Sequence, residues 1–201
     1  MEPEQSLHKY TAAEKLDDVA LALADYAHLK SPFQVGRSRR VADLAERVAR
    51  RIGLPEQEAM DVHRAALVHD IGIVAVPSFV LDKPQHQLTA VEREQVRLHP
   101  YHSERILSRV PALASIVPMV SAHHERMDGR GYHRGLTRER APRSARILAV
   151  TDQFDELTHD APDHLAMDPE RALDLMHQDV RPVSMASKGV TLVSLQSERV
   201  Q

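Results

Sequence analysis

Apolar residues recur every three or four positions along most of the chain, the spacing that places side chains on one face of an α-helix. The first such segment covers residues 12–29 and ends before Pro32, because proline cannot continue the hydrogen bonding of a helix. Later segments with the same period cover residues 38–53, 55–71, a stretch that begins at 89, and residues 112–125, 142–157 and 169–180. The pattern therefore predicts an all-α protein.

Residues at the predicted helix ends support these boundaries. Ser38 is expected to cap the second helix, and Pro55 suits the first turn of the third. Thr89 and Glu92 have the spacing of a capping box, in which each side chain bonds the other residue's backbone N–H. Pro118 predicts a kink in the helix that contains it.

The remaining segments lack a clear period. Residues 72–88 form a predicted connection, and residues 127–136 form a loop with three glycines. We predict a single helical domain over residues 12–180. Residues 1–11 form an N-terminal tail, and residues 181–201 form a C-terminal tail whose pattern assigns no fold.

Composition excludes several classes of protein. The chain of 201 residues has no cysteine, which rules out disulfides, thiolate zinc sites and iron–sulfur clusters. It has no run of about 18 apolar residues, so no membrane span is expected. Its polar N-terminus does not resemble a signal peptide, so we expect a cytoplasmic protein. A net charge of −3 gives no electrostatic reason to expect nucleic acid as a partner.

Histidine is unusually frequent, with 13 in the chain and eight of them between His63 and His133. Imidazole nitrogen and carboxylate oxygen are common ligands of Zn²⁺, Fe and Mn²⁺. Six such groups exceed the needs of one tetrahedral ion. They suit two ions about 3.5–4 Å apart, an arrangement that activates water against a phosphoryl group. The candidate ligands are His69, Asp70, His99, His123, His124 and Asp152.

Other histidines and several arginines are interpreted as ordinary, because isolated histidines mostly lie at the surface or bond within the core. These histidines are His8, His28, His63, His86, His159 and His177. A basic cluster at helical spacing is expected to form a solvated helix face. It consists of Arg37, Arg39, Arg40, Arg47, Arg50 and Arg51.

Four segments in order carry a resemblance to a known family. They are HDIGIVAVP (69–77), LDKPQHQLTAVEREQVRLHP (81–100), HHERMDGRGYHRGL (123–136) and ARILAVTDQFDELT (145–158). Together they resemble the HD-GYP phosphodiesterases, a branch of the HD superfamily of metal-dependent phosphohydrolases. The similarity runs from about residue 25 to about residue 172.

The resemblance implies a single HD-type helical bundle that hydrolyses a cyclic dinucleotide such as cyclic di-GMP by a metal-activated water, in a signalling role. It implies that Asp70 bridges two metal ions and acts with His69 in catalysis, while the other four candidate ligands complete the cluster. The expected metal is Fe, Mn, Zn or Ni, with one or two ions bound. Candidate substrate-binding residues are Arg126, Arg130 and Tyr132, and Glu125 is a candidate for orienting His124.

The sequence departs from the family at four places. Arg37 stands where the family has a histidine ligand, and Ile73 stands where it has a lysine. His133 replaces the proline of Gly-Tyr-Pro, and residues 161–164 lack both arginines of an Arg-Pro-Tyr-Arg stretch. These losses leave open an alternative from another class, a catalytically impaired regulatory module that binds metal, nucleotide or a signalling-protein partner.

Overall fold

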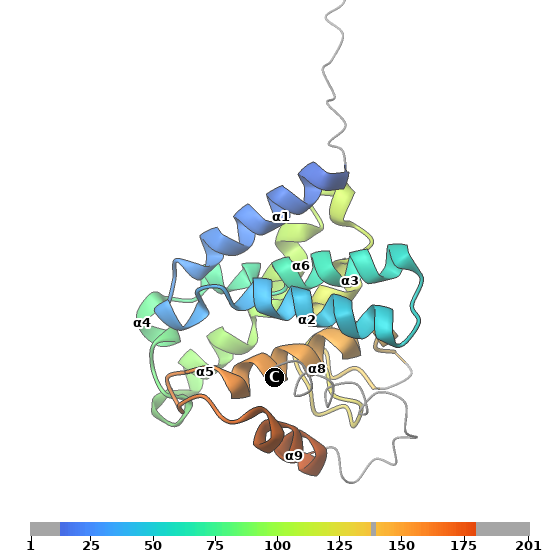
Figure 1. Cartoon of the computed structure of the whole chain (residues 1–201). Helices are drawn as coiled ribbons and strands as arrows, with labels where there is room; N and C mark the ends of the chain where they lie inside the picture. Colours follow the sequence, from blue (N-terminus) through green and yellow to red (C-terminus); the bar gives the residue numbers. More distant parts are fainter. Residues whose placement is uncertain (1–12, 138–139, 180–201) are drawn as a thin grey trace, which may run out of the picture.

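A computed structural model of the chain describes residues 13–137 and 140–179, and within these ranges the regular structure is helical (Figure 1). The all-α prediction is confirmed. The predicted tails, residues 1–11 and 181–201, lie outside the described residues. The α-helices are α1 (Ala13–His28), α2 (Arg37–Arg51), α3 (Glu56–Val68), α4 (Ser78–Leu81), α5 (Ala90–Arg97), α6 (His99–Leu107), α7 (Val117–Ser121), α8 (Arg143–Thr158) and α9 (Pro169–Asp179). Short 3-10 helices are η1 (Pro32–Gln34), η2 (Ile71–Ala75), η3 (Gln85–Gln87) and η4 (Pro111–Leu113).

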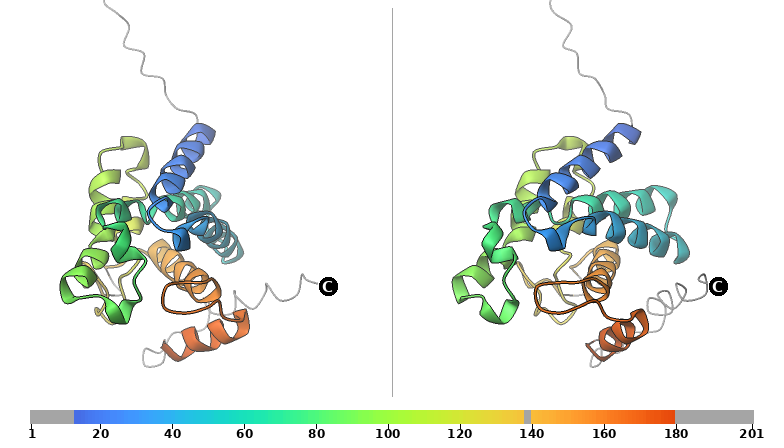
Figure 2. Two further views of the ribbon diagram at one scale, coloured as in Figure 1. Left: turned by 90° about the vertical axis from the view of Figure 1, so that its left-hand side faces the viewer. Right: turned by 60° about the vertical axis from the view of Figure 1, so that its left-hand side comes forward.

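Helices α2 and α3 form the centre of the bundle, with α1 on one side of them and α8 on the other (Figures 1 and 2). Their buried side chains are mostly small, which allows the two helices to approach closely. These side chains include Ala42, Ala45 and Ala49 of α2 and Ala59, Val62 and Ala66 of α3, all without exposed surface. Larger residues such as Leu107 of α6 and Leu148 of α8 complete the core.

Helix α9 covers the outer side of α8 (Figure 2). Phe154 of α8 packs there with Ala172 and Met176 of α9, and the three form a small cluster separate from the main core. Burial of these apolar side chains attaches α9 to the bundle. In this way α8 contacts the core on one side and α9 on the other.

Several predicted helix boundaries are wrong. Residues 112–125 do not form one kinked helix, because η4 is followed by a new helix, α7, with Pro118 in its first turn. Proline fits there because the first N–H groups of a helix have no partner within it. Ser38 does not cap α2, since Gly36 precedes the helix with a φ of 75° and the Ser38 hydroxyl lies 3.1 Å from Nε2 of His28.

Other local expectations hold more closely. The capping box of α5 is present, with the Thr89 hydroxyl accepting from the Glu92 N–H and the Glu92 carboxylate accepting from the Thr89 N–H. The connection over residues 72–88 contains most of η2, together with α4 and η3. The predicted end of the third helix at residue 71 is wrong, because α3 ends at Val68 and His69 and Asp70 follow the helix.

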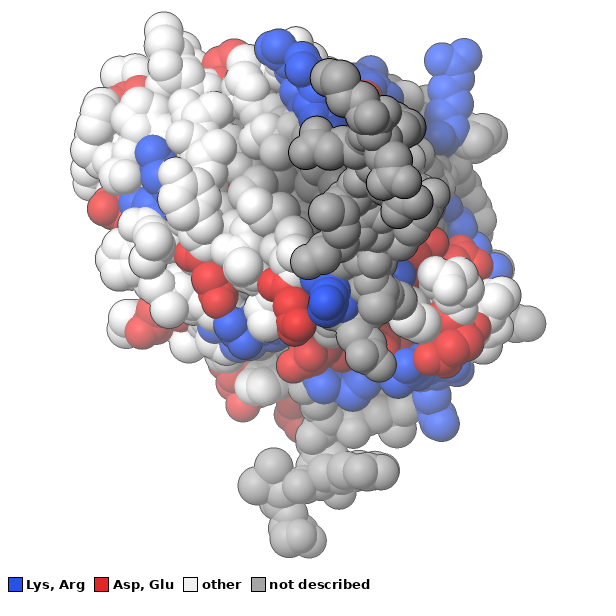
Figure 3. All heavy atoms as spheres, turned by 90° about the horizontal axis from the view of Figure 1, so that it is seen from above, with Lys and Arg blue, Asp and Glu red and all other residues white. Residues whose placement is uncertain are grey.

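The described surface carries charges of both signs. In the view from above, acidic and basic side chains lie next to each other across the lower part of the molecule, and uncharged residues occupy most of its upper left (Figure 3). Among the described helices, none is both long enough and apolar enough to cross a bilayer.

Candidate metal centre

The six candidate ligands come from separate segments and converge inside the bundle. His69 and Asp70 follow α3, His99 begins α6, and Asp152 lies in α8. His123 and His124 follow α7. Their ligand atoms form two groups that share Asp70, and within each group the atoms lie within 4.8 Å of one another. We call Asp70, His99, His123 and His124 the histidine set, and His69, Asp70 and Asp152 the carboxylate set.

Asp70 divides its two oxygens between these sets. Its Oδ1 lies 3.2 Å from Nε2 of His99 and 3.7 Å from Nε2 of His123. Its Oδ2 lies 3.0 Å from Nε2 of His69, and that nitrogen is also 3.1 Å from Oδ1 of Asp152. The Asp70 carboxylate therefore joins the two groups.

Backbone contacts orient three of the imidazole rings in the same way. In each ring Nδ1 lies 2.6–2.7 Å from the carbonyl oxygen three residues earlier, and because a carbonyl only accepts, Nδ1 carries the hydrogen. In His99 and His123 the neutral ring then presents a bare Nε2 to the cluster, as metal-binding histidines do. The Nε2 of His69 instead faces two carboxylate oxygens, of Asp70 and Asp152. The three pairs are His69 with Ala66, His99 with Val96, and His123 with Val120.

This orientation creates a need for a cation. Nε2 of His99 lies 3.1 Å from Nε2 of His123, and both are close to Oδ1 of Asp70. Three acceptors thus face one another in a buried space, and a positive ion between them relieves their repulsion. Imidazole and carboxylate ligands without thiolate suit a divalent ion of the Fe, Mn, Zn or Ni type. The residues of the histidine set fit a metal.

Contact between α6 and η2 positions the central residues. The Ser103 hydroxyl donates to the carbonyl oxygen of His69 at 2.7 Å and accepts from the N–H of Gly72 at 2.9 Å. Gly72 is required because a Cβ there would lie 2.0 Å from the carbonyl oxygen of His99. The close approach brings His69 and Asp70 to the start of α6.

An aromatic contact holds the exposed side of the histidine set. The ring of Tyr132 stacks on His124 with centroids 4.7 Å apart and an interplanar angle of 24°. The His99 ring meets His124 edge-on at 4.9 Å. The guanidinium of Arg97 lies over the Tyr132 ring, 5.0 Å from its centroid. Tyr132 therefore adjoins the cluster, as its assignment to substrate binding requires.

Glu125 anchors the glycine-containing loop. Its buried carboxylate accepts from the N–H groups of Arg134 and Leu136, both at 2.7 Å. The sequence suggests that Glu125 orients His124, but the carboxylate binds the loop backbone instead. Two buried hydrogen bonds to one charged group are strong contacts. They fix the path of the loop that carries Tyr132.

The expectation of a solvated face is wrong for Arg37. Its side chain is 13% exposed, and its Nη2 lies 2.8 Å from Oδ1 of Asp152 and 3.4 Å from Oε2 of Glu156. Arg40, one turn later, bonds the buried carboxylate of Asp155 at 2.7 and 2.9 Å. Both arginines of α2 face α8, whose carboxylates attract them.

Charge within the cluster shifts several pKa values. Burial favours protonation of the Asp152 carboxylate, but the Arg37 guanidinium and the His69 ring outweigh it and hold the pKa of Asp152 below its usual range. Burial likewise opposes charge on His69, yet Asp70 and Asp152 raise the pKa of that ring to about 10. Burial, with His123 and His99 nearby, holds the pKa of His124 well below its usual value. His124 is therefore neutral and able to bind a cation.

The predicted substrate-binding arginines lie on the exposed part of the loop. Arg126 and Arg130 are exposed, and Nε of Arg126 is 3.5 Å from Oδ1 of Asp128. Ile73, in place of the family's lysine, is buried in the apolar core. In the 161–164 stretch, Asp163 accepts from the N–H of Gln85 at 2.5 Å. In this chain the carboxylate of Asp163 therefore binds the backbone at the start of η3.

Sequence reasoning missed two residues of the site, Glu156 and Arg97. Glu156 is four residues after Asp152, so helical spacing alone places both on one face of α8. Arg97 is far from the loop in sequence, and its contact with Tyr132 depends on the fold. The described histidines interpreted as ordinary lie outside both sets. His8 lies outside the described residues.

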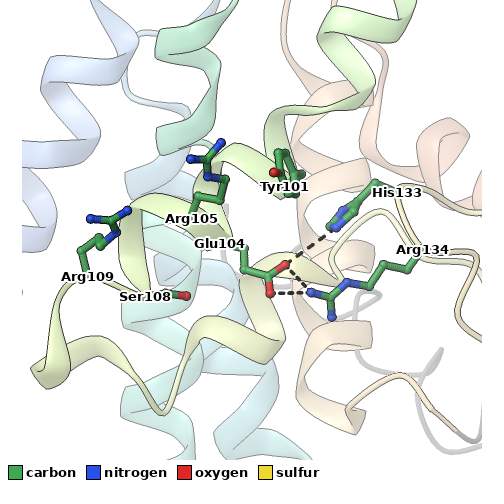
Figure 4. A pocket seen from close by; sticks show the side chains of 7 residues that line it. All are labelled: Tyr101, Glu104, Arg105, Ser108, Arg109, His133 and Arg134. Atoms are coloured by element: carbon green, nitrogen blue, oxygen red, sulfur yellow. Dashed lines mark hydrogen bonds and ion pairs between the residues drawn. The ribbon is translucent and has the colours of Figure 1, made fainter.

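An open pocket adjoins the loop beside the cluster (Figure 4). His133 and Arg134 line it on the loop side, and both side chains point toward Glu104 of α6. Tyr101, Arg105, Ser108 and Arg109 complete its lining. The pocket is separate from the histidine set, so it does not hold the candidate ligands.

Comparison with known proteins supports one family. A family model described as HD domain matches residues 22–182. The chain is 33% identical over 165 residues to the 3'3'-cGAMP-specific phosphodiesterase 3 of Vibrio cholerae, covering 82% of this chain and 36% of the relative. It is 37% identical over 142 residues to the cyclic di-GMP phosphodiesterase response regulator RpfG of Xanthomonas campestris, covering 69% of this chain and 37% of the relative.

The fold agrees with a solved structure. An HDG"Y"P protein from Bdellovibrio bacteriovorus superimposes with a TM-score of 0.67 and 14% identity, covering 92% of this chain and 64% of that protein. The chain spans little more than a third of the length of the two relatives above. It belongs to the HD-domain family, as the resemblance of its motifs to the HD-GYP branch implied.

Proposed function

We propose that this chain hydrolyses a phosphodiester bond of a cyclic dinucleotide, using a divalent metal held by the histidine set. The observation that carries the proposal is the convergence of bare imidazole nitrogens on the buried Asp70 within an HD-domain fold. The similar proteins are named for hydrolysis of 3'3'-cGAMP and cyclic di-GMP, which sets the substrate class.

The metal would be held by Asp70, His99, His123 and His124. A bound divalent ion acts as a Lewis acid on phosphoryl oxygens and lowers the pKa of water. The backbone carbonyls of α5 and α7 hold His99 and His123 in the orientation that this site needs. The buried ring of His123 excludes bulk water from the inner side of the site.

Residues at the open side supply substrate contacts in this proposal. Tyr132 and Arg97 form a stacked pair beside His124, which suits an aromatic base or a phosphate. Arg126 and Arg130 extend the same loop with positive charge, which suits the anionic backbone of a dinucleotide. We assign these loop residues and Tyr132 to substrate binding.

A second candidate function rests on the departures from the family. Ile73 is buried in the core, and Asp163 presents a carboxylate where the family has a phosphate-binding stretch. A module with these residues would bind a cyclic dinucleotide or a signalling protein without turnover. We rank it second because the histidine set itself is complete.

Turnover of cyclic dinucleotides separates the two functions. Cyclic di-GMP and 3'3'-cGAMP are incubated with Mn²⁺-loaded protein, and linear products are measured by chromatography. The wild type is expected to be active, and Asp70→Asn to lose at least about 100-fold, because it removes charge from the ligand that joins both sets. Asp43→Asn, an exposed change on α2, is the control and keeps activity.

Activity that survives Asp70→Asn would overturn the assignment of the site. Metal-loaded wild type that binds a cyclic dinucleotide without any product would favour the regulatory module instead.

A further inference from the structure

The histidine set and the carboxylate set differ in whether a guanidinium lies against their ligand atoms. The histidine set consists of acceptors facing one another, as His99 and His123 do with Nε2 atoms 3.1 Å apart. The carboxylate set has a guanidinium in contact with it, because Arg37 of α2 bonds Asp152. The same Asp70 carboxylate therefore faces imidazole nitrogens on one side and a guanidinium on the other.

Arg37 occupies the acceptor atoms that a second ion would need. Its Nε and Nη2 lie 3.2 and 2.8 Å from Oδ1 of Asp152, the same oxygen that faces His69. Its Nε is also 3.8 Å from Oδ2 of Asp70. Both carboxylates of the carboxylate set thus direct an oxygen toward the guanidinium. A divalent ion bound by the carboxylate set would have to displace the Arg37 guanidinium.

Displacement is disfavoured by the surroundings of Arg37. The side chain is 13% exposed, and Glu156 adds a third carboxylate to its contacts at 3.4 Å. A guanidinium stays protonated in proteins and offers hydrogen-bond donors only, so it cannot become a metal ligand. It repels a nearby cation for the same reason. The carboxylate set does not fit a metal ion while Arg37 is in place.

We propose that Arg37 replaces the second metal ion, so that the chain binds one divalent ion at the histidine set and a fixed guanidinium supplies the other positive charge. This rests on the proposed function for the identity of the histidine set as a metal site. The arrangement gives a phosphodiester two neighbouring positive groups, one exchangeable and one covalently built into α2. Arginine is well suited to the second role because its fork binds phosphate oxygens.

Arg40 provides a matched control within the same interface. It also connects α2 to α8, and it bonds Asp155 with two hydrogen bonds one turn further along both helices. Asp155 belongs to neither set. Replacing Arg40 therefore perturbs the packing of α2 on α8 without freeing a candidate ligand.

Metal content tests the proposal. Protein purified without chelator is loaded with Mn²⁺, desalted and measured by mass spectrometry for wild type, Arg37→His, Arg37→Ala and Arg40→His. We expect one equivalent in wild type and Arg40→His, and two in Arg37→His. Electron paramagnetic resonance should show an isolated Mn²⁺ in wild type and an exchange-coupled pair in Arg37→His. Arg37→Ala, which adds no imidazole, should gain the second ion at higher Mn²⁺ concentration.

The other outcomes separate the two proposals. Two equivalents in wild type, or one equivalent in both Arg37 variants with circular dichroism unchanged, would overturn the role of Arg37 and leave the proposed function intact. No bound metal in wild type or in any variant would overturn the metal site of the proposed function itself.

Discussion

Arg37 donates two hydrogen bonds to one oxygen of Asp152, from Nε at 3.2 Å and from Nη2 at 2.8 Å. The two residues are 115 positions apart, so the pair ties the start of α2 to the middle of α8 across the cluster. Because the Asp152 side chain is only 4% exposed, the carboxylate depends on this partner for compensation of its charge.

Removal of Arg37 should destabilise the metal-free protein. In Arg37→Ala, three carboxylates lose their common cation, and breaking a buried ion pair costs about 3–5 kcal/mol. For a chain of this size, the melting temperature should fall by on the order of 10 °C. Differential scanning calorimetry in the presence of a chelator measures the change.

Mn²⁺ should raise the melting temperature more in Arg37→Ala than in the wild type. Mn²⁺ that binds the vacated carboxylate set of Arg37→Ala stabilises the folded state by mass action. A smaller Mn²⁺-induced rise in melting temperature in Arg37→Ala than in wild type would contradict the account.

The Ser103 hydroxyl should be necessary for both stability and metal affinity. Ser103→Ala leaves the carbonyl of His69 and the N–H of Gly72 without their partner in a buried position, which costs about 1–3 kcal/mol. The shift of His69 should also weaken metal binding. Urea unfolding and Mn²⁺ titration measure the two effects. Ser108→Ala, an exposed change just after the same helix, should alter neither.

Much of the helical framework could be predicted from the sequence. The apolar positions of the first segment predict a helix over residues 12–29, and α1 spans Ala13–His28. The error at residues 112–125 has a physical cause. A proline in the interior of a helix and one in the first turn of a new helix look alike in sequence, and only packing of η4 and α7 decides between them.

The candidate ligands of the site could be predicted from the sequence, but the ion pairs that Arg37 makes with them could not. The six groups were found from their chemistry and motifs, and the structure brings them together. The basic residues around Arg37 in the sequence predict a solvated side chain. Its true position depends on α8, which supplies Asp152 and Glu156 from a distant part of the chain. Long-range packing of this kind leaves no local pattern.

Glu125 should control the order of the loop that carries Tyr132. Glu125→Gln keeps the shape of the side chain but removes the charge that accepts from Arg134 and Leu136, so both amide groups lose strong partners. Hydrogen exchange at these two amides should accelerate roughly tenfold, in keeping with a loss of about 1.4 kcal/mol. Glu94→Gln, an exposed change on α5, is the control. Unchanged exchange in the Glu125 variant would show that the loop is held by other contacts.

Tyr132 should affect metal binding through its ring and substrate binding through its hydroxyl. Tyr132→Phe keeps the stack on His124, so Mn²⁺ affinity should be unchanged while KM for the cyclic dinucleotide rises. Tyr132→Ala removes the stack and should lower Mn²⁺ affinity roughly tenfold, as loss of a group that orients a ligand does. Equal Mn²⁺ affinity in both variants would argue against an orienting role for the ring.

The most direct test of the metal centre is anomalous diffraction at the Mn absorption edge from crystals of the Mn²⁺-loaded protein. The account predicts one anomalous peak, among Asp70, His99, His123 and His124, with Arg37 still bonded to Asp152. A second peak between His69 and Asp152, or no peak at the histidine set, would contradict it.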